Sequence, residues 1–357
     1  MEKQKLKGRG ASFNPQNRFE KLSVEDFSFD DWSEPEEAGL KNLSTEYFID
    51  NSKTVIAKND SYDLGFDYSF NPYRGCEHGC IYCYARPSHE YLGFSSGIDF
   101  ETKIMVKQDA ANLLEAEFRK KNYKPDVILF SGNTDCYQPI EKKLGITKEA
   151  LKICLKFGNP AAIITKNALI QKDIDILKEM AELEIVSVTL SVTTLDKDLA
   201  RKMEPRASSP EMRLKTIKVL AENGIPVGVN LAPIIPGLND KEIPEILKKA
   251  SERGAIHAGY IMLRLPYTVK DLFIEWLKRE YPLKASKIIS SIKSIRGGKL
   301  NSSEWGVRFK GEGEIARAIE SLFKLNCRKY SLNKRNYNLT TKHFKAPSGN
   351  NQLKLFA

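Results

Sequence analysis

The sequence predicts an α/β fold of five or six parallel strand–helix units, and three observations support this prediction. Short β-branched runs alternate with amphipathic helical patterns between about residues 61 and 265. The units recur roughly every 25–40 residues, which is the length of a βα unit. Glycine marks the helix ends, as at Asn223-Gly224 and Arg253-Gly254. Such a pattern fits either a partial TIM-type barrel or an open doubly wound sheet, and periodicity does not separate them.

Taken in chain order, the elements begin after a polar, charge-segregated N-terminal arm, residues 1–60. The expected strands lie at 67–70, 126–131, 161–165, 185–193, 226–235 and 257–265. The expected helices between them lie at 108–121, 147–157, 169–183, 210–223 and 241–253. Alternation stops there, so we expect a helical C-terminal extension over 266–345, with helices at 271–279, 284–295 and 314–325, and then a flexible tail over 346–357.

Composition narrows the class of protein. The N-terminal stretch is basic but has no apolar segment behind it, and no window approaches the roughly 18 apolar residues of a membrane span. We therefore expect a cytoplasmic protein without membrane contact. Of six cysteines, three fall within residues 76–83 and three are scattered singly. That distribution indicates a metal site and not a disulfide framework.

The net charge is +10, and the charged residues are distributed unevenly along the chain. Residues 23–38 contain seven acidic and no basic residues, whereas residues 321–357 contain eight Lys or Arg and no Asp or Glu. Aromatic residues are interleaved with the C-terminal basic charges. This combination suits a polyanion such as nucleic acid, with rings available for base stacking; the alternative is a solubilising tail.

The cysteine group reads C-x3-C-x2-C, with Cys76, Cys80 and Cys83 on one short loop. Three thiolates bind three corners of a cubane iron–sulfur cluster and leave the fourth iron without a protein ligand. An open coordination position is what makes a metal site catalytic. Gly75 and Gly79 supply the tight turns that a loop around a cluster needs.

A zinc knuckle is the alternative interpretation of these cysteines. Zinc in structural sites takes four protein ligands. The fourth ligand here would have to be His78, His89 or a distant cysteine.

The residue before Cys83 is Tyr82, so the motif is C-x3-C-x-aromatic-C and resembles the signature of the radical S-adenosylmethionine (SAM) enzymes. This resemblance implies a partial (β/α)6 TIM-type barrel, a [4Fe–4S] cluster and S-adenosyl-L-methionine as cofactors. Longer runs resemble bacterial proteins labelled DNA-repair photolyases, which are similar to spore photoproduct lyase: NPYRGCEHGCIYCYARPSHEYLG, SGNTDCYQPIE, SVTTLDKDLARKMEPR and PIIPGLND.

The resemblance also implies a reaction. Reductive cleavage of SAM at the cluster gives a 5′-deoxyadenosyl radical, which abstracts a hydrogen from the substrate, and an electron donor such as flavodoxin or ferredoxin reduces the cluster. We expect a lyase-like or modifying enzyme that acts on nucleic acid. The alternatives are a radical SAM enzyme acting on a protein or small molecule, and a non-catalytic zinc module that binds nucleic acid.

Several residues are candidates for the methionine end of the cofactor. Gly132 follows the second expected strand and allows close approach, and Asn133 or Asp135 can accept from the ammonium group. Lys166 ends the third expected strand and is a candidate for the carboxylate. Cys136 is a candidate hydrogen donor, since spore photoproduct lyase uses a cysteine just after this strand.

Five further residues are candidates for the rest of the cofactor. The resemblance places the Tyr82 ring beside adenine. Thr193 and Asn230 are candidates for ribose or adenine contacts, and the turn at Pro236 brings backbone towards the adenine. Arg213 can clamp a carboxylate or phosphate, or can form a surface ion pair.

The final residues suggest a partner. The pentapeptide from Gln352 to Phe356 reads QLKLF and resembles the motif by which bacterial repair and replication proteins bind the DNA sliding clamp. The alternative is that these apolar residues fold back onto the C-terminal helix as an anchor.

Overall fold

The computed structural model describes residues 6–19, 43–334 and 338–345, and its centre is a seven-stranded sheet. The strands follow the order β10-β9-β8-β7-β6-β3-β2. All neighbours from β3 to β10 are parallel, and β2 is antiparallel to β3. The strand bounds are β2 Ile56–Lys58, β3 Tyr68–Phe70, β6 Ile128–Phe130, β7 Ala161–Thr165, β8 Val186–Ser191, β9 Val227–Ile234 and β10 His257–Met262.

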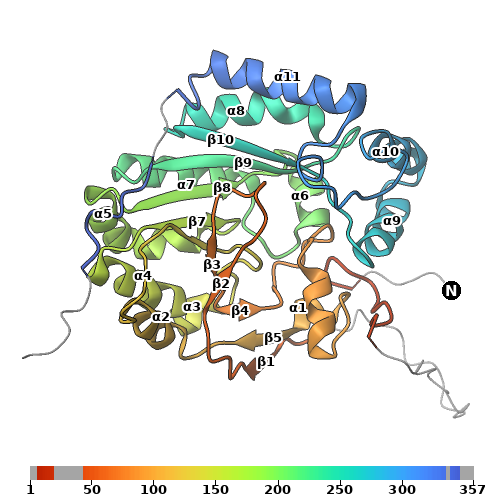
Figure 1. Cartoon of the computed structure of the whole chain (residues 1–357). Helices are drawn as coiled ribbons and strands as arrows, with labels where there is room; N and C mark the ends of the chain where they lie inside the picture. Colours follow the sequence, from red (N-terminus) through yellow and green to blue (C-terminus); the bar gives the residue numbers. More distant parts are fainter. Residues whose placement is uncertain (1–5, 20–42, 335–337, 346–357) are drawn as a thin grey trace, which may run out of the picture.

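The strand order identifies the architecture. A doubly wound sheet reverses its order near the middle, whereas here each successive parallel strand is added on the same side of the last. Right-handed crossovers then place the helices on one face of the sheet, and Figure 1 shows them around its outside. These helices are α2 Ala110–Phe118, α4 Ile146–Phe157, α5 Ile174–Glu182, α7 Pro210–Glu222 and α8 Ile243–Ser251. The predicted α/β fold, a partial TIM-type barrel, is confirmed.

Burial along the strands shows which face holds the core. In β7, Ala161, Ile163 and Thr165 are buried, while Ala162 and Ile164 are only half-buried. This alternation places one set of side chains beneath the helices and the other towards the inside of the barrel. The core therefore lies between sheet and helices, which leaves the inside available for a ligand.

A second, three-stranded sheet joins the N-terminal region to the barrel. Its order is β1-β5-β4, with bounds β1 Glu46–Ile49, β4 Tyr73–Arg74 and β5 Lys103–Val106. The sequence predicts no strands in residues 1–60, yet β1 and β2 both lie there. Every residue of β1 is exposed, so the strand carries no alternating pattern that could predict it.

Residues 6–19 pack behind the cysteine loop. The amide groups of Gly10 and Ala11 donate to the buried carboxylate of Glu101, at 3.0 and 2.8 Å, and Arg86 forms a buried ion pair with the same carboxylate. A Cβ atom on Gly10 would lie 1.9 Å from the carbonyl oxygen of Gly79. Only glycine fits this contact, so the N-terminal segment is closely fitted to the loop.

The predicted helices of the C-terminal extension are present as α9, α10 and α11. Phe273 and Trp276 of α9 share a buried cluster with Cys80, Ile81 and Tyr82, so this helix packs directly on the cysteine loop. α11 packs over α8. The bounds are α9 Val269–Glu280, α10 Pro282–Ser294 and α11 Gly313–Lys329. The remaining helical segments are the 3-10 helices Arg86–Leu92, Ala168–Asp173 and Asp240–Glu242, with α1 Asp99–Thr102, α3 Glu141–Leu144 and α6 Lys197–Met203.

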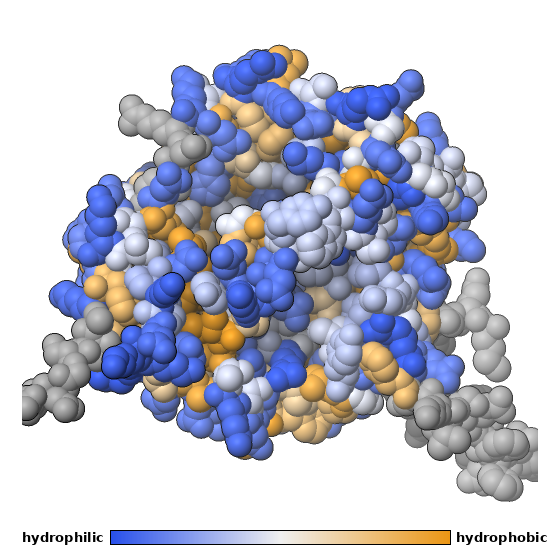
Figure 2. Space-filling view, in the orientation of Figure 1, coloured by the Kyte–Doolittle hydropathy of each residue, from blue (hydrophilic) through white to orange (hydrophobic). Residues whose placement is uncertain are grey.

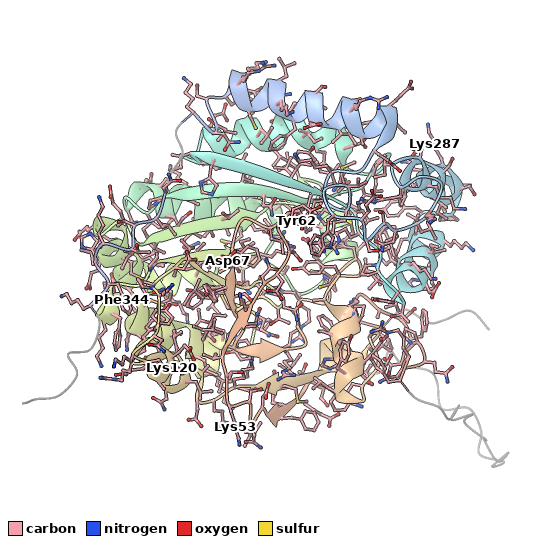
Figure 3. All side chains as sticks on the ribbon, in the orientation of Figure 1. Lys53, Tyr62, Asp67, Lys120, Lys287 and Phe344 are labelled. Atoms are coloured by element: carbon pink, nitrogen blue, oxygen red, sulfur yellow. The ribbon has the colours of Figure 1, made fainter. Side chains whose placement is uncertain are left out.

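The described end of the chain, residues 338–345, lies beside α2 and α4. The amide of Lys345 donates to the carbonyl of Phe157 at 2.8 Å, and that of Thr340 donates to the carbonyl of Glu184 at 3.1 Å. Phe344, labelled in Figure 3, packs among aromatic rings there. Phe157 and Glu184 precede β7 and β8, so this part of the basic region lies at the amino ends of the strands.

Two further observations concern membrane spans and the segments outside the described residues. In the described residues, no helix has the length and apolar character required to cross a membrane. The pentapeptide 352–356 and the acidic residues 23–38 lie outside the described residues.

Candidate cofactor and substrate site

A cavity of about 420 Å³ opens at the carboxyl ends of the parallel strands. Its volume lies in the range of small-molecule sites, and its place is the one where parallel α/β barrels gather their functional residues. Strand residues form its floor: Leu129, Ile164, Ser191, Asn230, Ala232 and Ile261.

The three cysteines of the motif all line this cavity. Gly75 and Gly79 have φ of 79° and 67°, the left-handed conformation that turns the loop and that glycine adopts without strain. Burial raises the pKa of all three thiols, Cys76, Cys80 and Cys83. Each is therefore a neutral thiol until a metal displaces its proton, as expected for buried metal ligands.

The number of cysteine ligands bears on whether the site holds a cluster or a single ion. Within the part of the chain that the structure describes, no three His, Cys, Asp or Glu side chains are grouped closely enough to hold one metal ion. Zinc brings all its ligands to one centre, whereas a cubane bonds each thiolate to a different iron and keeps the sulfur atoms farther apart. Three thiols on one loop match the ligand set of a [4Fe–4S] cluster with one open iron.

A buried polar network holds the aromatic residue of the motif. Tyr82 donates a hydrogen bond to the carboxylate of Glu204, which also accepts one from Thr193 at 2.7 Å and forms a buried ion pair with Arg213. Burial opposes ionisation of Glu204, but Arg213, Lys166 and Thr193 lower its pKa to about 2. The network fixes the Tyr82 ring, which lines the cavity beside the cysteines.

Asp135 belongs to a second network. Its carboxylate accepts from the amides of Lys166 and Tyr137 at 2.8 and 2.9 Å and from the Thr165 hydroxyl at 2.8 Å, and it lies 3.4 Å from the ring of His78. Burial opposes its ionisation, but His78 and the amides lower its pKa to about 2. Asp135 lines the cavity, yet these contacts also tie the loop after β6 to the end of β7 and to the cysteine loop.

Four other predicted residues also lie on the cavity wall: Gly132, Asn133, Lys166 and Asn230. A Cβ atom added to Gly132 would lie 2.8 Å from the Cβ atom of Ser69. The close packing against Ser69 therefore accounts for a glycine at this position. The Lys166 ammonium lies 5.9 Å from the Tyr82 ring centroid and forms no ion pair with any described residue. Its charge helps to lower the pKa of Glu204, but the ammonium group has no ion-pair partner in the described residues.

The remaining predicted residues lie off the wall. Thr193 and Arg213 are buried in the Glu204 network, so the ion pair of Arg213 is internal and not on the surface. Pro236 is buried and does not line the cavity. Cys136 belongs to the main hydrophobic core, with its thiol pKa raised by burial, and does not reach the cavity. The prediction of a hydrogen donor at Cys136 has no support from this geometry.

Sequence reasoning missed four residues that line the cavity: Tyr84, Arg264, Arg308 and Phe309. Tyr84 directly follows the last cysteine of the motif, which is the signal that could have found it; its hydroxyl donates to the carbonyl of Gly132 at 2.6 Å. Arg308 and Phe309 come from the loop between α10 and α11, and no sequence pattern ties this loop to the barrel.

The fold and the site together define a partial α/β barrel with a cysteine-lined cavity at the carboxyl ends of its strands. Residues 70–250, just over half of the chain, match the model of the Radical SAM superfamily. The chain belongs to this superfamily. Enzymes of the superfamily use a [4Fe–4S] cluster and SAM, and the donor set of this cavity fits both: three thiols on one loop, and a free ammonium group for a carboxylate.

Relatives extend across much of the barrel. An uncharacterized protein of Mycobacterium tuberculosis is 34% identical over 221 residues, which cover 61% of this chain and 65% of that protein. An uncharacterized protein of Methanocaldococcus jannaschii is 32% identical over 178 residues, 50% of this chain and 64% of that one. The radical SAM Nα-GlyT isomerase of Pseudomonas phage M6 is 22% identical over 223 residues, 62% and 44% of the two chains. The chain thus spans about two thirds or less of these relatives.

Among solved structures, the fold is similar to spore photoproduct lyase. The complex of that enzyme with a dinucleoside spore photoproduct superposes with a TM-score of 0.58 and 16% identity, over 80% of this chain and 79% of the lyase. Another structure of the lyase contains bound AdoMet together with the same dinucleoside, with a TM-score of 0.57 and 15% identity. At this identity the likeness shows the shared fold.

Proposed function

We propose that this protein uses a [4Fe–4S] cluster and SAM to perform radical chemistry on nucleic acid, as a repair or modifying enzyme. The observation that carries the proposal is a single cavity that combines three thiols with a cation-rich, aromatic wall. When bound, the cluster and SAM supply a 5′-deoxyadenosyl radical that removes a hydrogen atom from the substrate.

In this proposal the residues of the chain bind and orient the cofactors. Cys76, Cys80 and Cys83 hold the cluster. Tyr82, fixed by Glu204, presents its ring to the adenine side. Lys166 binds the SAM carboxylate with its unpaired ammonium group. The packed core behind the wall excludes water from the reacting groups.

We predict that Lys166→Gln raises the dissociation constant for SAM about tenfold or more. The lost hydrogen bond is charge-assisted, and such bonds contribute about 1.5–3 kcal/mol. The measurement is calorimetric titration of SAM into anaerobic, cluster-loaded protein. Lys172→Gln is the matched control, because Lys172 is an exposed lysine of the next segment, away from the cavity. Equal affinities of the two variants would remove Lys166 from the cofactor site.

Charge supports nucleic acid as the substrate over a protein or small molecule. Among the lining residues that the structure describes, Lys166, Arg264 and Arg308 are basic, and Asp135 is the one carboxylate. The whole chain carries a net charge of +10. A positive groove with aromatic side chains is the usual way in which proteins bind single-stranded nucleic acid.

The test of the substrate is transfer of isotope. Cluster-loaded protein, a strong reductant and SAM deuterated at C5′ are incubated anaerobically with undamaged or ultraviolet-damaged DNA and RNA. We expect 5′-deoxyadenosine to form slowly without substrate and faster with the right one, together with exchange of deuterium with the nucleic acid. Stimulation only by protein or small-molecule fractions would contradict the nucleic-acid proposal and leave the radical chemistry intact.

The remaining partner proposals concern regions away from the cavity. An electron donor such as flavodoxin or ferredoxin would reduce the cluster, and the expected compartment is the cytoplasm. The motif Gln352–Phe356 would tether the enzyme to a DNA sliding clamp. The described end of the basic region, residues 338–345, lies at the amino ends of the strands, whereas the cavity lies at their carboxyl ends. The basic region would therefore serve as a tether and would not line the site.

A further inference from the structure

Arg264 is a half-buried cation on the cavity wall that forms no ion pair with a described residue. Its Nε atom is buried and has no hydrogen-bond partner among the described residues. None of the ion pairs of the described chain includes its guanidinium group, and burial lowers its pKa, as does the nearby Arg308. A guanidinium group carries five donors that need acceptors, so a half-buried guanidinium group with an unpaired buried Nε atom and no ion-pair partner is suited to an anionic ligand.

The surroundings of Arg264 hold its guanidinium carbon in place. It lies 5.5 Å from the ring centroid of Tyr84 and 4.9 Å from that of Phe309. The carbonyl of Phe309 accepts from the amide of Met262 at 2.8 Å, which fixes this loop to the end of β10. Buried Arg296 also bonds the carbonyls of Val307 and Leu263, at 3.0 and 2.7 Å. The position of the cation is therefore built into the fold.

An exposed aromatic pair, Tyr62 and Trp305, adjoins the lining residues Ser61 and Arg308. Tyr62 and Trp305 are exposed by 74% and 45%, and their rings meet edge to face with centroids 4.7 Å apart. Arg308, which also lines the cavity, lies near the Trp305 ring. It forms an ion pair with Asp63, and this pair connects the loop that carries Tyr62 to the loop that carries Trp305. Tyr62 is labelled near the middle of Figure 3, and Figure 2 shows that hydrophilic residues cover most of this face. Exposed rings next to a cation suit a base and its phosphate.

We propose that Arg264 binds a phosphate group of the substrate strand inside the cavity, with an adjacent base on the Tyr62–Trp305 pair. The proposal rests on the nucleic-acid function above and identifies the substrate group that this wall recognises. A guanidinium group binds a phosphate through two parallel hydrogen bonds, and the flanking rings of Tyr84 and Phe309 leave Arg264 oriented for such a contact. Arg308 is already engaged by Asp63, so Arg264 is the free donor.

The experiment measures binding of a single-stranded tetranucleotide to the cluster-loaded protein by fluorescence anisotropy, without turnover. One strand has ordinary phosphodiesters and a second has neutral methylphosphonates in their place. We expect Arg264→Gln to weaken binding of the charged strand roughly tenfold or more and to leave the neutral strand unchanged. The slope of log affinity against log salt should fall by about 0.7, the value for one phosphate on a single strand.

Two further variants make the result decisive. Arg264→Lys keeps the charge and should retain the salt slope, with intermediate affinity. Lys287→Gln removes an exposed charge on α10, labelled at the edge of Figure 3, and should bind as the wild type does. Iron content and unfolding midpoint report whether each variant is folded. If the wild type and a folded Arg264→Gln bind the charged strand equally, the phosphate site is wrong while the nucleic-acid function stands. If the wild type binds neither strand, the nucleic-acid function fails and the phosphate site fails with it.

Discussion

Replacing any one of Cys76, Cys80 or Cys83 with Ala should abolish both cluster binding and SAM cleavage. Three thiolates are the smallest set that holds a cubane while leaving one iron free for the cofactor, and the structure places all three on the wall of one cavity. The measurement is iron and sulfide content with the visible absorbance of anaerobically reconstituted protein, followed by an assay of 5′-deoxyadenosine under strong reductant. We expect complete loss of the product in each variant.

A matched control separates loss of a ligand from loss of a buried thiol. Cys154 is fully buried in the main core on α4, away from the cavity. Cys154→Ala should keep the full cluster and the full rate of SAM cleavage, with only a modest loss of stability from the small cavity that it creates. A complete [4Fe–4S] complement in any of the three ligand variants would contradict the assignment.

The sequence could predict the barrel because its signals are local. The strands and helices from β3 to β10 show their own periodicity, and the helix ends carry glycine at positions such as Gly224 and Gly254. The cysteine motif is equally local, since its ligands lie within eight residues of one another. Lys166 and Asn230 could be predicted as wall residues because the carboxyl ends of parallel strands meet at one edge.

The contacts that the sequence could not predict join distant segments. The fit of Gly10 against the carbonyl of Gly79 requires the N-terminal segment to return beneath the cysteine loop, and no spacing in the sequence encodes that path. Arg308 reaches the cavity only because the loop after α10 is fixed to β10, whereas Arg264 lies just after β10, where the same strand-end argument could have found it. Cys136 follows the expected strand, but its side chain lies in the core, so its role as a hydrogen donor stays a prediction.

Glu204→Gln should destabilise the folded protein by about 3–5 kcal/mol, the usual cost of removing one partner of a buried ion pair. Glu204 and Arg213 are 3% and 1% exposed, so the substitution leaves the guanidinium group buried without its counter-charge. It also replaces the carboxylate that accepts from Tyr82 and Thr193 with a neutral amide. The measurement is the free energy of unfolding by urea under anaerobic conditions, for protein with and without the cluster.

The loss of stability in Glu204→Gln comes from burial of the ion pair and not from its charge alone. An exposed ion pair on the neighbouring helix can test this explanation. Asp198 and Arg201 of α6 form an ion pair with side chains 77% and 76% exposed. Asp198→Asn should cost about 0–1 kcal/mol, because water replaces the lost partner. Replacing both buried partners, as Glu204→Leu with Arg213→Met, should restore part of the stability lost in Glu204→Gln. That double variant should still bind SAM more weakly than the wild type, since the Tyr82 ring has lost its acceptor. If Glu204→Gln and Asp198→Asn destabilise the protein equally, the network around Tyr82 does not hold the motif in place.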